Sequence, residues 1–76
     1  MSKQRFVEFY LSAMMKAATG GRVSKVTYQY TKAGKRLPAK EYVTINFEDQ
    51  SCVPVSVTDC DLLGIALEVV KAVKGQ

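Results

Sequence analysis

Histidine and tryptophan are absent from this chain, and cysteine occurs only twice. Without histidine the chain lacks the commonest general base and the commonest metal ligand. Two cysteines alone cannot complete a four-ligand structural zinc site within one chain. We therefore expect that the protein is not an enzyme and that it uses neither a metal nor a cofactor.

The two cysteines are also poorly spaced for a disulfide. Cys52 opens a predicted strand and Cys60 follows the far end of that strand. Strand geometry separates them by roughly 16 Å or more, whereas a disulfide tolerates Cα atoms at most about 7 Å apart. We expect two free thiols.

Long apolar runs are missing as well. No stretch of 18 or more apolar residues is present, so no transmembrane segment and no membrane partner are expected. Lys3 and Arg5 precede an apolar stretch, but Glu8 interrupts it and its spacing is helical, so a signal peptide is not predicted. A cytoplasmic location is expected.

Short motifs that resemble catalytic or phosphate-binding patterns have simpler interpretations. Gly20-Gly21-Arg22 follows a predicted helix where a phosphate loop requires a strand, and its glycine spacing fits neither nucleotide fingerprint. The pair Glu48-Asp49 suits a turn. Asp59 and Asp61 suit the positive end of a helix dipole.

The 76 residues form one predicted domain, spanning 1-76, and 47% of them are hydrophobic. A chain this short buries only about 60% of its unfolded surface, but this apolar content supplies a core. The net charge is +4, and the charges are segregated along the chain. The segment from Arg22 to Lys40 holds only basic charges, and the segment from Glu41 to Glu68 holds only acidic ones. Such asymmetry can steer an anionic partner.

The segment from Thr58 to Lys74 predicts a helix, capped by Thr58 or Asp59 and ended by Gly75. Apolar residues occupy about two thirds of its circumference, more than one buried stripe requires. We therefore predict an apolar surface that a second copy covers in a two-fold homodimer, with Leu63, Leu67 and Val70 as the candidate dimer residues.

A second helix is predicted from Ser2, its cap, to about Thr19, before Gly20-Gly21. Its predicted core side consists of residues spaced three and four apart: Phe6, Val7, Tyr10, Leu11, Ala13, Met14, Ala17 and Ala18. In the alternative to a dimer, Phe6, Phe9, Tyr10 and Met14 wrap around the last helix and seal it.

Three segments alternate between apolar and polar residues, as half-buried strands do: Ser24–Thr31, Glu41–Phe47 and Cys52–Val57. Pro54 cannot donate to a ladder, which predicts that the third strand lies at a sheet edge. The fold class is therefore α+β, in the order α-β-β-β-α: a three-stranded antiparallel meander with both helices packed on one face. The first strand then forms the other edge, a second route by which two copies can pair.

The loop from 31 to 40 is basic. It carries two interpretations, a solvated hairpin loop or a phosphate-contacting finger. The candidate partner or phosphate contacts are Arg22, Lys25, Lys32, Lys35, Arg36 and Lys40.

The element order and length are similar to those of the double-stranded RNA-binding domain. In that family the first helix, the loop between the first two strands and a lysine-rich start of the last helix contact RNA. Here the loop is basic and the first helix carries Lys3, Arg5 and Lys16, but the last region departs from the pattern, with acids in Thr58-Asp59-Cys60-Asp61.

Two functional hypotheses follow. The first is a small non-enzymatic protein–protein interaction module, an adaptor or inhibitor of the kind that phages and mobile elements encode. Its partner is a protein, and in one form of this hypothesis that protein is itself associated with nucleic acid. The alternative is a nucleic-acid-binding accessory module that uses the basic loop 31-40. The spare apolar surface of the last helix favours the first.

Overall fold

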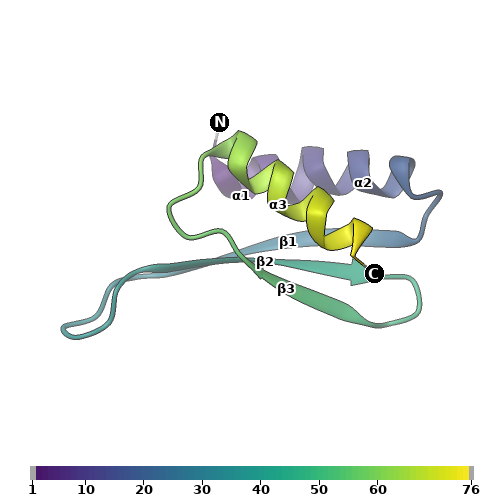
Figure 1. The fold of residues 1–76 in the computed structure, drawn as a ribbon. Helices are drawn as coiled ribbons and strands as arrows, with labels where there is room; N and C mark the ends of the chain where they lie inside the picture. Colours follow the sequence, from purple (N-terminus) through teal and green to yellow (C-terminus); the bar gives the residue numbers. More distant parts are fainter. Residues whose placement is uncertain (1, 76) are drawn as a thin grey trace.

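A computed structural model describes residues 2–75 of the chain. A helical segment precedes three strands and a final helix, as the sequence predicts. The elements are α1 (Lys3–Arg5), η1 (Phe6–Leu11), α2 (Ser12–Ala18), β1 (Val23–Thr31), β2 (Lys40–Phe47), β3 (Cys52–Ser56) and α3 (Leu62–Lys74). We call the continuous unit α1–η1–α2 the first helix. Figure 1 shows both helices on one face of the sheet, which confirms the predicted fold class.

The sheet is an antiparallel meander in the order β1-β2-β3. β3 is an edge strand, as Pro54 predicts. An irregularity at Ser24 shifts the register of β1, so that Val23 pairs with Phe47 and Lys25 with Asn46. Because of this bulge, Val23 and Val26 both face the core although they are three residues apart.

The first helix has the predicted ends. The Ser2 hydroxyl accepts a hydrogen bond from the Arg5 N–H at 3.1 Å, which satisfies one of the free donors of the first turn. The helix stops where Gly20 and Gly21 take φ values of 62° and 90°, which glycine adopts without a steric penalty.

The core side of the first helix was predicted correctly for Val7 and Leu11, which are buried, and for Phe6, which packs against the core, but not for the other positions. Buried positions are Val7, Leu11 and Met15, while Tyr10 and Met14 are exposed; Ala13, Ala17 and Ala18 are exposed as well. The cause is the π-helical turn η1, in which the Ser12 N–H donates to the carbonyl of Val7, five residues back. Because a π turn holds more residues than an α turn, side chains four apart align on one face.

The start of the last helix was also predicted too early. α3 begins at Leu62, with the carboxylate of Asp61 accepting from the Gly64 N–H at 2.7 Å. The Thr58 hydroxyl instead accepts a hydrogen bond from the Glu41 N–H of β2, and Asp59 has a left-handed φ of 63°. These two residues therefore form the turn before the helix rather than its first turn.

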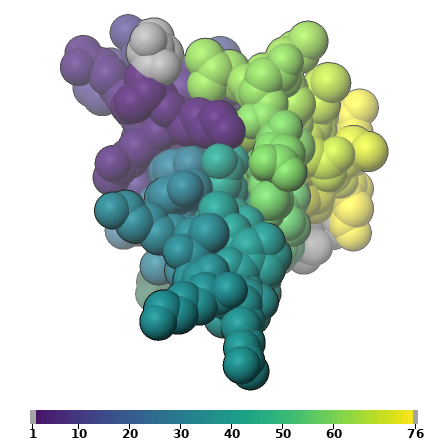
Figure 2. Space-filling view, turned by 90° about the vertical axis from the view of Figure 1, so that its left-hand side faces the viewer, coloured from purple at the N-terminus to yellow at the C-terminus, as the bar shows by residue number. Residues whose placement is uncertain are grey.

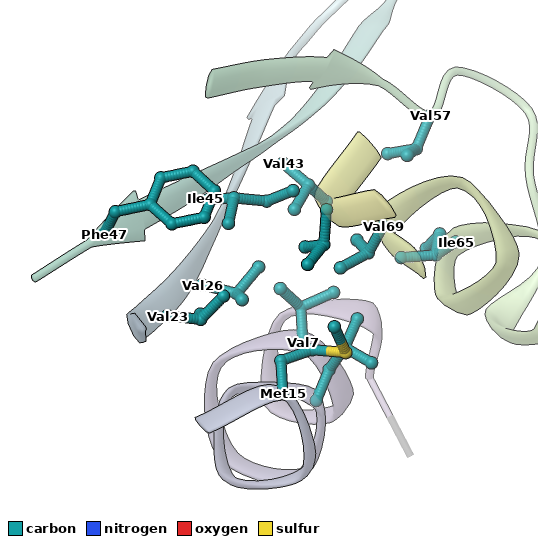
Figure 3. Close-up of a cluster of buried hydrophobic side chains, with 12 residues drawn as sticks. Val7, Met15, Val23, Val26, Val43, Ile45, Phe47, Val57, Ile65 and Val69 are labelled. Carbon is teal, nitrogen blue, oxygen red and sulfur yellow. The ribbon is translucent and has the colours of Figure 1, made fainter. Parts of the chain in front are cut away.

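The core lies between the sheet and the two helices (Figure 3). The first helix packs chiefly on β1, whereas α3 packs on β2 and β3. The buried side chains are all apolar: Val7, Leu11, Met15, Val23, Val26, Val43, Ile45, Phe47, Val57, Ile65, Val69 and Val73. No helix within residues 2–75 combines the length and apolar content needed to cross a bilayer.

Candidate functional site

The helical layer leaves several large apolar side chains in contact with solvent. Their exposed fractions are 65% for Phe9, 41% for Tyr10, 53% for Met14, 67% for Leu63 and 55% for Leu67. The Phe9 and Tyr10 rings meet edge to face at 5.3 Å. The predicted sealing of the last helix by these aromatic residues is therefore not what the structure shows.

A groove separates the carboxyl-terminal halves of the two helices. It has a volume of about 450 Å³ and is lined by Met15, Ala18, Thr19 and Arg22 from one side and by Val70, Val73 and Lys74 from the other. Leu67 and Leu63 lie three and seven residues before Val70, on the same face of α3. Met14 and Tyr10 lie four and eight residues before Ala18, on the corresponding face of the first helix.

These two rows define one surface, which we call the helical groove: Tyr10, Met14 and Ala18 on the first helix, and Leu63, Leu67 and Val70 on α3. All three predicted dimer residues belong to it. Leu63 and Leu67 are exposed, and Val70 is half-buried against the core. The sequence missed the contribution of Tyr10 and Met14, because they were assigned to the core.

One end of the helical layer is tied to the sheet by an ion pair. The Lys3 ammonium lies 3.0 Å from the Glu41 carboxylate of β2. This hydrogen bond raises the pKa of Lys3, against the opposing effect of desolvation. The positive charge of Lys3 therefore balances the negative charge of Glu41 on the inner side of the sheet.

The free edge of β1 is covered by side chains of the first helix. Thr19 accepts from the Val23 N–H, Ser12 accepts from the Val26 N–H and also donates to its carbonyl, and Glu8 accepts from the Tyr28 N–H. The sequence predicted an open edge on this strand. Because these backbone groups are already hydrogen-bonded, the edge from Val23 to Tyr28 cannot pair with a second strand without breaking these bonds.

The predicted basic contacts separate into three places. Lys32, Lys35, Arg36 and Lys40 lie on an exposed hairpin that extends well beyond the body (Figures 1 and 2). The Gly34 N–H donates to the Leu37 carbonyl at 2.9 Å and closes its tip. We call residues 31–40 the basic hairpin.

Arg22 does not join the basic hairpin. It precedes β1 at the opposite end of the sheet, with its guanidinium carbon 5.8 Å from the centre of the Phe47 ring. Glu48 and Asp49 line the same shallow surface. Lys25 lies between the two ends, paired with Asn46 on the strand face that points away from the helices.

That side of the sheet is a second exposed surface, which we call the outer face. Register places the following residues on it: Lys25, Thr27, Gln29 and Thr31 of β1, Lys40, Tyr42, Thr44 and Asn46 of β2, and Cys52, Pro54 and Ser56 of β3. None of these side chains is acidic. Both cysteines are free; Cys52 is exposed on this face, and Cys60 lies in the turn before α3.

The carboxylates of Asp49 and Asp61 have structural partners. Asp49 accepts hydrogen bonds from the Ser51 hydroxyl and N–H, which lower its pKa, and Asp61 caps α3. Within residues 2–75 no group of three or more cysteine and carboxylate side chains is arranged to hold a metal ion.

Comparisons with protein-family models, curated proteins and solved structures found no match.

Proposed function

We propose that this chain is a small non-enzymatic protein-interaction module, an adaptor or inhibitor, and that it works as a homodimer joined through the helical groove. The observation that carries the proposal is the double row of exposed apolar side chains on both sides of the groove. A folded protein rarely leaves so many large apolar residues of neighbouring helices in water without a partner.

The surface area of the chain agrees with an uncovered interface. The accessible area is 5232 Å² for a mass of 8.4 kDa, whereas a compact monomer of this mass exposes about 4,600 Å². The chain therefore exposes about 600 Å² more than a compact monomer, and one side of a standard interface buries about 800 Å².

A second copy is the occupant that supplies two matching apolar rows. A two-fold axis along the groove sets the first helix of one copy, with Tyr10 and Met14, against α3 of the other, with Leu63 and Leu67, twice. Burial of Leu63 and Leu67 then supplies the association energy, at about 25 cal/mol per Å² of apolar area.

The π-helical turn supports a functional role for this surface. Such turns are rare inside α-helices and are frequent at functional sites. Here the turn rotates Tyr10 and Met14 out of the core and into the groove. Because the β1 edge is occupied by side chains of the first helix, the groove is also the better supported of the two routes to a dimer.

Light scattering on the purified chain tests the proposal. We expect twice the chain mass of 8.4 kDa at micromolar concentration. Leu67→Lys should dissociate the dimer without unfolding it, because Leu67 is exposed in the single chain. Thr27→Lys, the same added charge on the outer face, should leave the mass doubled. A wild-type mass near that of one chain would reject the dimer.

We further propose that the protein acts in the cytoplasm. The support is Cys52, an exposed free thiol on a flat polar surface, since reducing compartments keep such thiols unpaired.

A further inference from the structure

We propose that the outer face and the basic hairpin together bind B-form duplex DNA, with the β1–β2 ribbon lying in the major groove. This goes beyond the dimer, because it uses the opposite side of the sheet and shares no residue with the helical groove. Three properties of this surface carry the inference: its side-chain chemistry, its spacing and its charge.

The chemistry of the outer face suits the edges of base pairs. Its β1–β2 part consists of cross-strand pairs, of which three are central: Lys25 with Asn46, Thr27 with Thr44, and Gln29 with Tyr42. Asparagine and glutamine pair with adenine, lysine donates to guanine, and the threonine methyl group contacts thymine. The face has no large aliphatic side chain, so it offers a protein partner little apolar area to bury.

The spacing of these pairs also fits. Successive residues on one face of a strand lie about 6.6 Å apart, close to two base-pair steps of about 3.4 Å each. Neighbouring strands are about 4.8 Å apart, so a two-stranded ribbon enters a major groove about 12 Å wide. On β3 the outer residues are the short Cys52, Pro54 and Ser56, which leaves the β1–β2 ribbon as the more prominent part of the face.

The charge of the surface matches a polyanion. Lys25 and Lys40 are on the outer face, and Lys32, Lys35 and Arg36 lie on the basic hairpin, which continues the same two strands. Figure 1 shows the hairpin curving away from the helices, toward the side on which the outer face lies. Glu41 is engaged with Lys3 and Glu8 with the β1 backbone, both on the other side, and Glu48 borders Lys25 and Asn46 at the end of the outer face far from the hairpin.

Duplex DNA fits better than the other nucleic acids. The major groove of A-form RNA is too narrow for side chains to read. Single strands are bound by stacking on several aromatic residues, and the outer face has only Tyr42. The acidic turn before α3 meets the start of β2, where the Thr58 hydroxyl accepts from the Glu41 N–H, and its Asp61 carboxylate is engaged in capping α3.

Fluorescence anisotropy with a labelled 20-base-pair DNA of mixed sequence tests the inference. We expect binding that weakens with salt, because each neutralised phosphate contributes about −0.9 to the slope of log K against log salt. Replacing Lys32, Lys35, Arg36 and Lys40 by Ala should make the slope shallower by about 3 to 4. A duplex RNA of the same sequence and the corresponding single strand serve as competitors and should bind more weakly.

A matched pair of isosteric variants isolates the outer face. Gln29→Glu and Gln4→Glu each add one negative charge at an exposed position, the first on the outer face and the second on the first helix. We expect Gln29→Glu to weaken duplex binding about tenfold or more, since it repels phosphate and loses a base contact. Gln4→Glu should change it by less than about twofold, because salt screens the distant charge.

Amide chemical shifts provide a second readout that does not depend on the variants. On addition of the duplex, shifts should move in β1, β2 and the basic hairpin and remain unchanged in the helical groove. No binding at 50 mM salt, equal effects of the two glutamine variants, or tighter binding of duplex RNA would each overturn the proposal. None of these results bears on the dimer, which light scattering tests without nucleic acid.

Discussion

The Glu8 carboxylate on the first helix lies 3.0 Å from the backbone nitrogen of Tyr28 and accepts its hydrogen bond. Ser12 and Thr19 do the same for Val26 and Val23. One row of side chains on the first helix therefore takes the place of a missing neighbouring strand. This row ties the helix to the sheet and closes an edge that otherwise invites a second chain.

Ser12→Ala tests the most heavily used member of this row. The hydroxyl of Ser12 accepts from the Val26 N–H and donates to its carbonyl, both at 2.8 Å. Its removal leaves partly buried backbone groups unsatisfied, so we expect a loss of about 1–3 kcal/mol in the free energy of unfolding. Urea denaturation measures it. Ser56→Ala, at an exposed position of β3, should cost less than about 0.5 kcal/mol; equal losses would mean that the Ser12 bonds are not formed in solution.

Two apolar residues of α3 should differ sharply in their effect on stability. Ile65 is fully buried and Leu63 is 67% exposed. Ile65→Ala should cost about 2–5 kcal/mol because it opens a cavity. Leu63→Ala should cost less than about 0.5 kcal/mol, when measured at a concentration low enough to keep the chain monomeric. A reversed order would show that α3 is rotated about its axis relative to the structure.

The cap of α3 provides a third test. Asp61→Ala removes the acceptor for the Gly64 N–H and should lower the free energy of unfolding by about 1 kcal/mol. Asp59 has a left-handed φ and does not cap the helix, so Asp59→Asn, which tolerates that conformation, should be nearly neutral. A larger loss at Asp59 than at Asp61 would return the helix start to the earlier position that the sequence suggested.

The turn between β2 and β3 predicts a pH-dependent signal. The Ser51 hydroxyl and N–H donate to the Asp49 carboxylate and hold its pKa below its ordinary value. A carboxyl group with a lowered folded pKa stabilises the fold above its unfolded pKa, and this contribution is lost as the pH falls through the folded value. In an NMR titration, Ser51→Ala should therefore raise the pKa of Asp49. An unchanged titration midpoint would contradict the turn geometry.

The sequence predicted the element order, the strand faces and the edge position of Pro54 correctly, because period-2 alternation and proline chemistry act locally. It did not predict the burial of Met15 in place of Met14, since a π turn changes the angular spacing and leaves no clear pattern in the residues. It also placed the start of α3 four residues early. The Thr58 hydroxyl can either cap a helix or accept a hydrogen bond from the Glu41 N–H. Only the folded sheet brings Glu41 close enough for the second interaction to form.

For the surfaces, the sequence identified the cations of the hairpin and the leucines of α3, which periodicity and charge reveal. It did not separate Arg22 from the hairpin, because a run of basic residues along the chain does not show that the strand between them holds its two ends far apart. It placed Tyr10 and Met14 beside the last helix only in the alternative in which they seal it. It did not predict that they stay exposed next to Leu63, since that depends on how two helices distant in sequence lie on the same sheet.

Both helices cover the same face of the sheet, and this has a consequence for how the two proposed surfaces work together. In a dimer joined through its helices, the helical layers lie at the centre and the outer faces of the two sheets point in opposite directions. Two such sheets cannot read neighbouring half-sites on one straight duplex. The assembly would instead hold two separate duplex segments, one on each side, and act as a bridge between them.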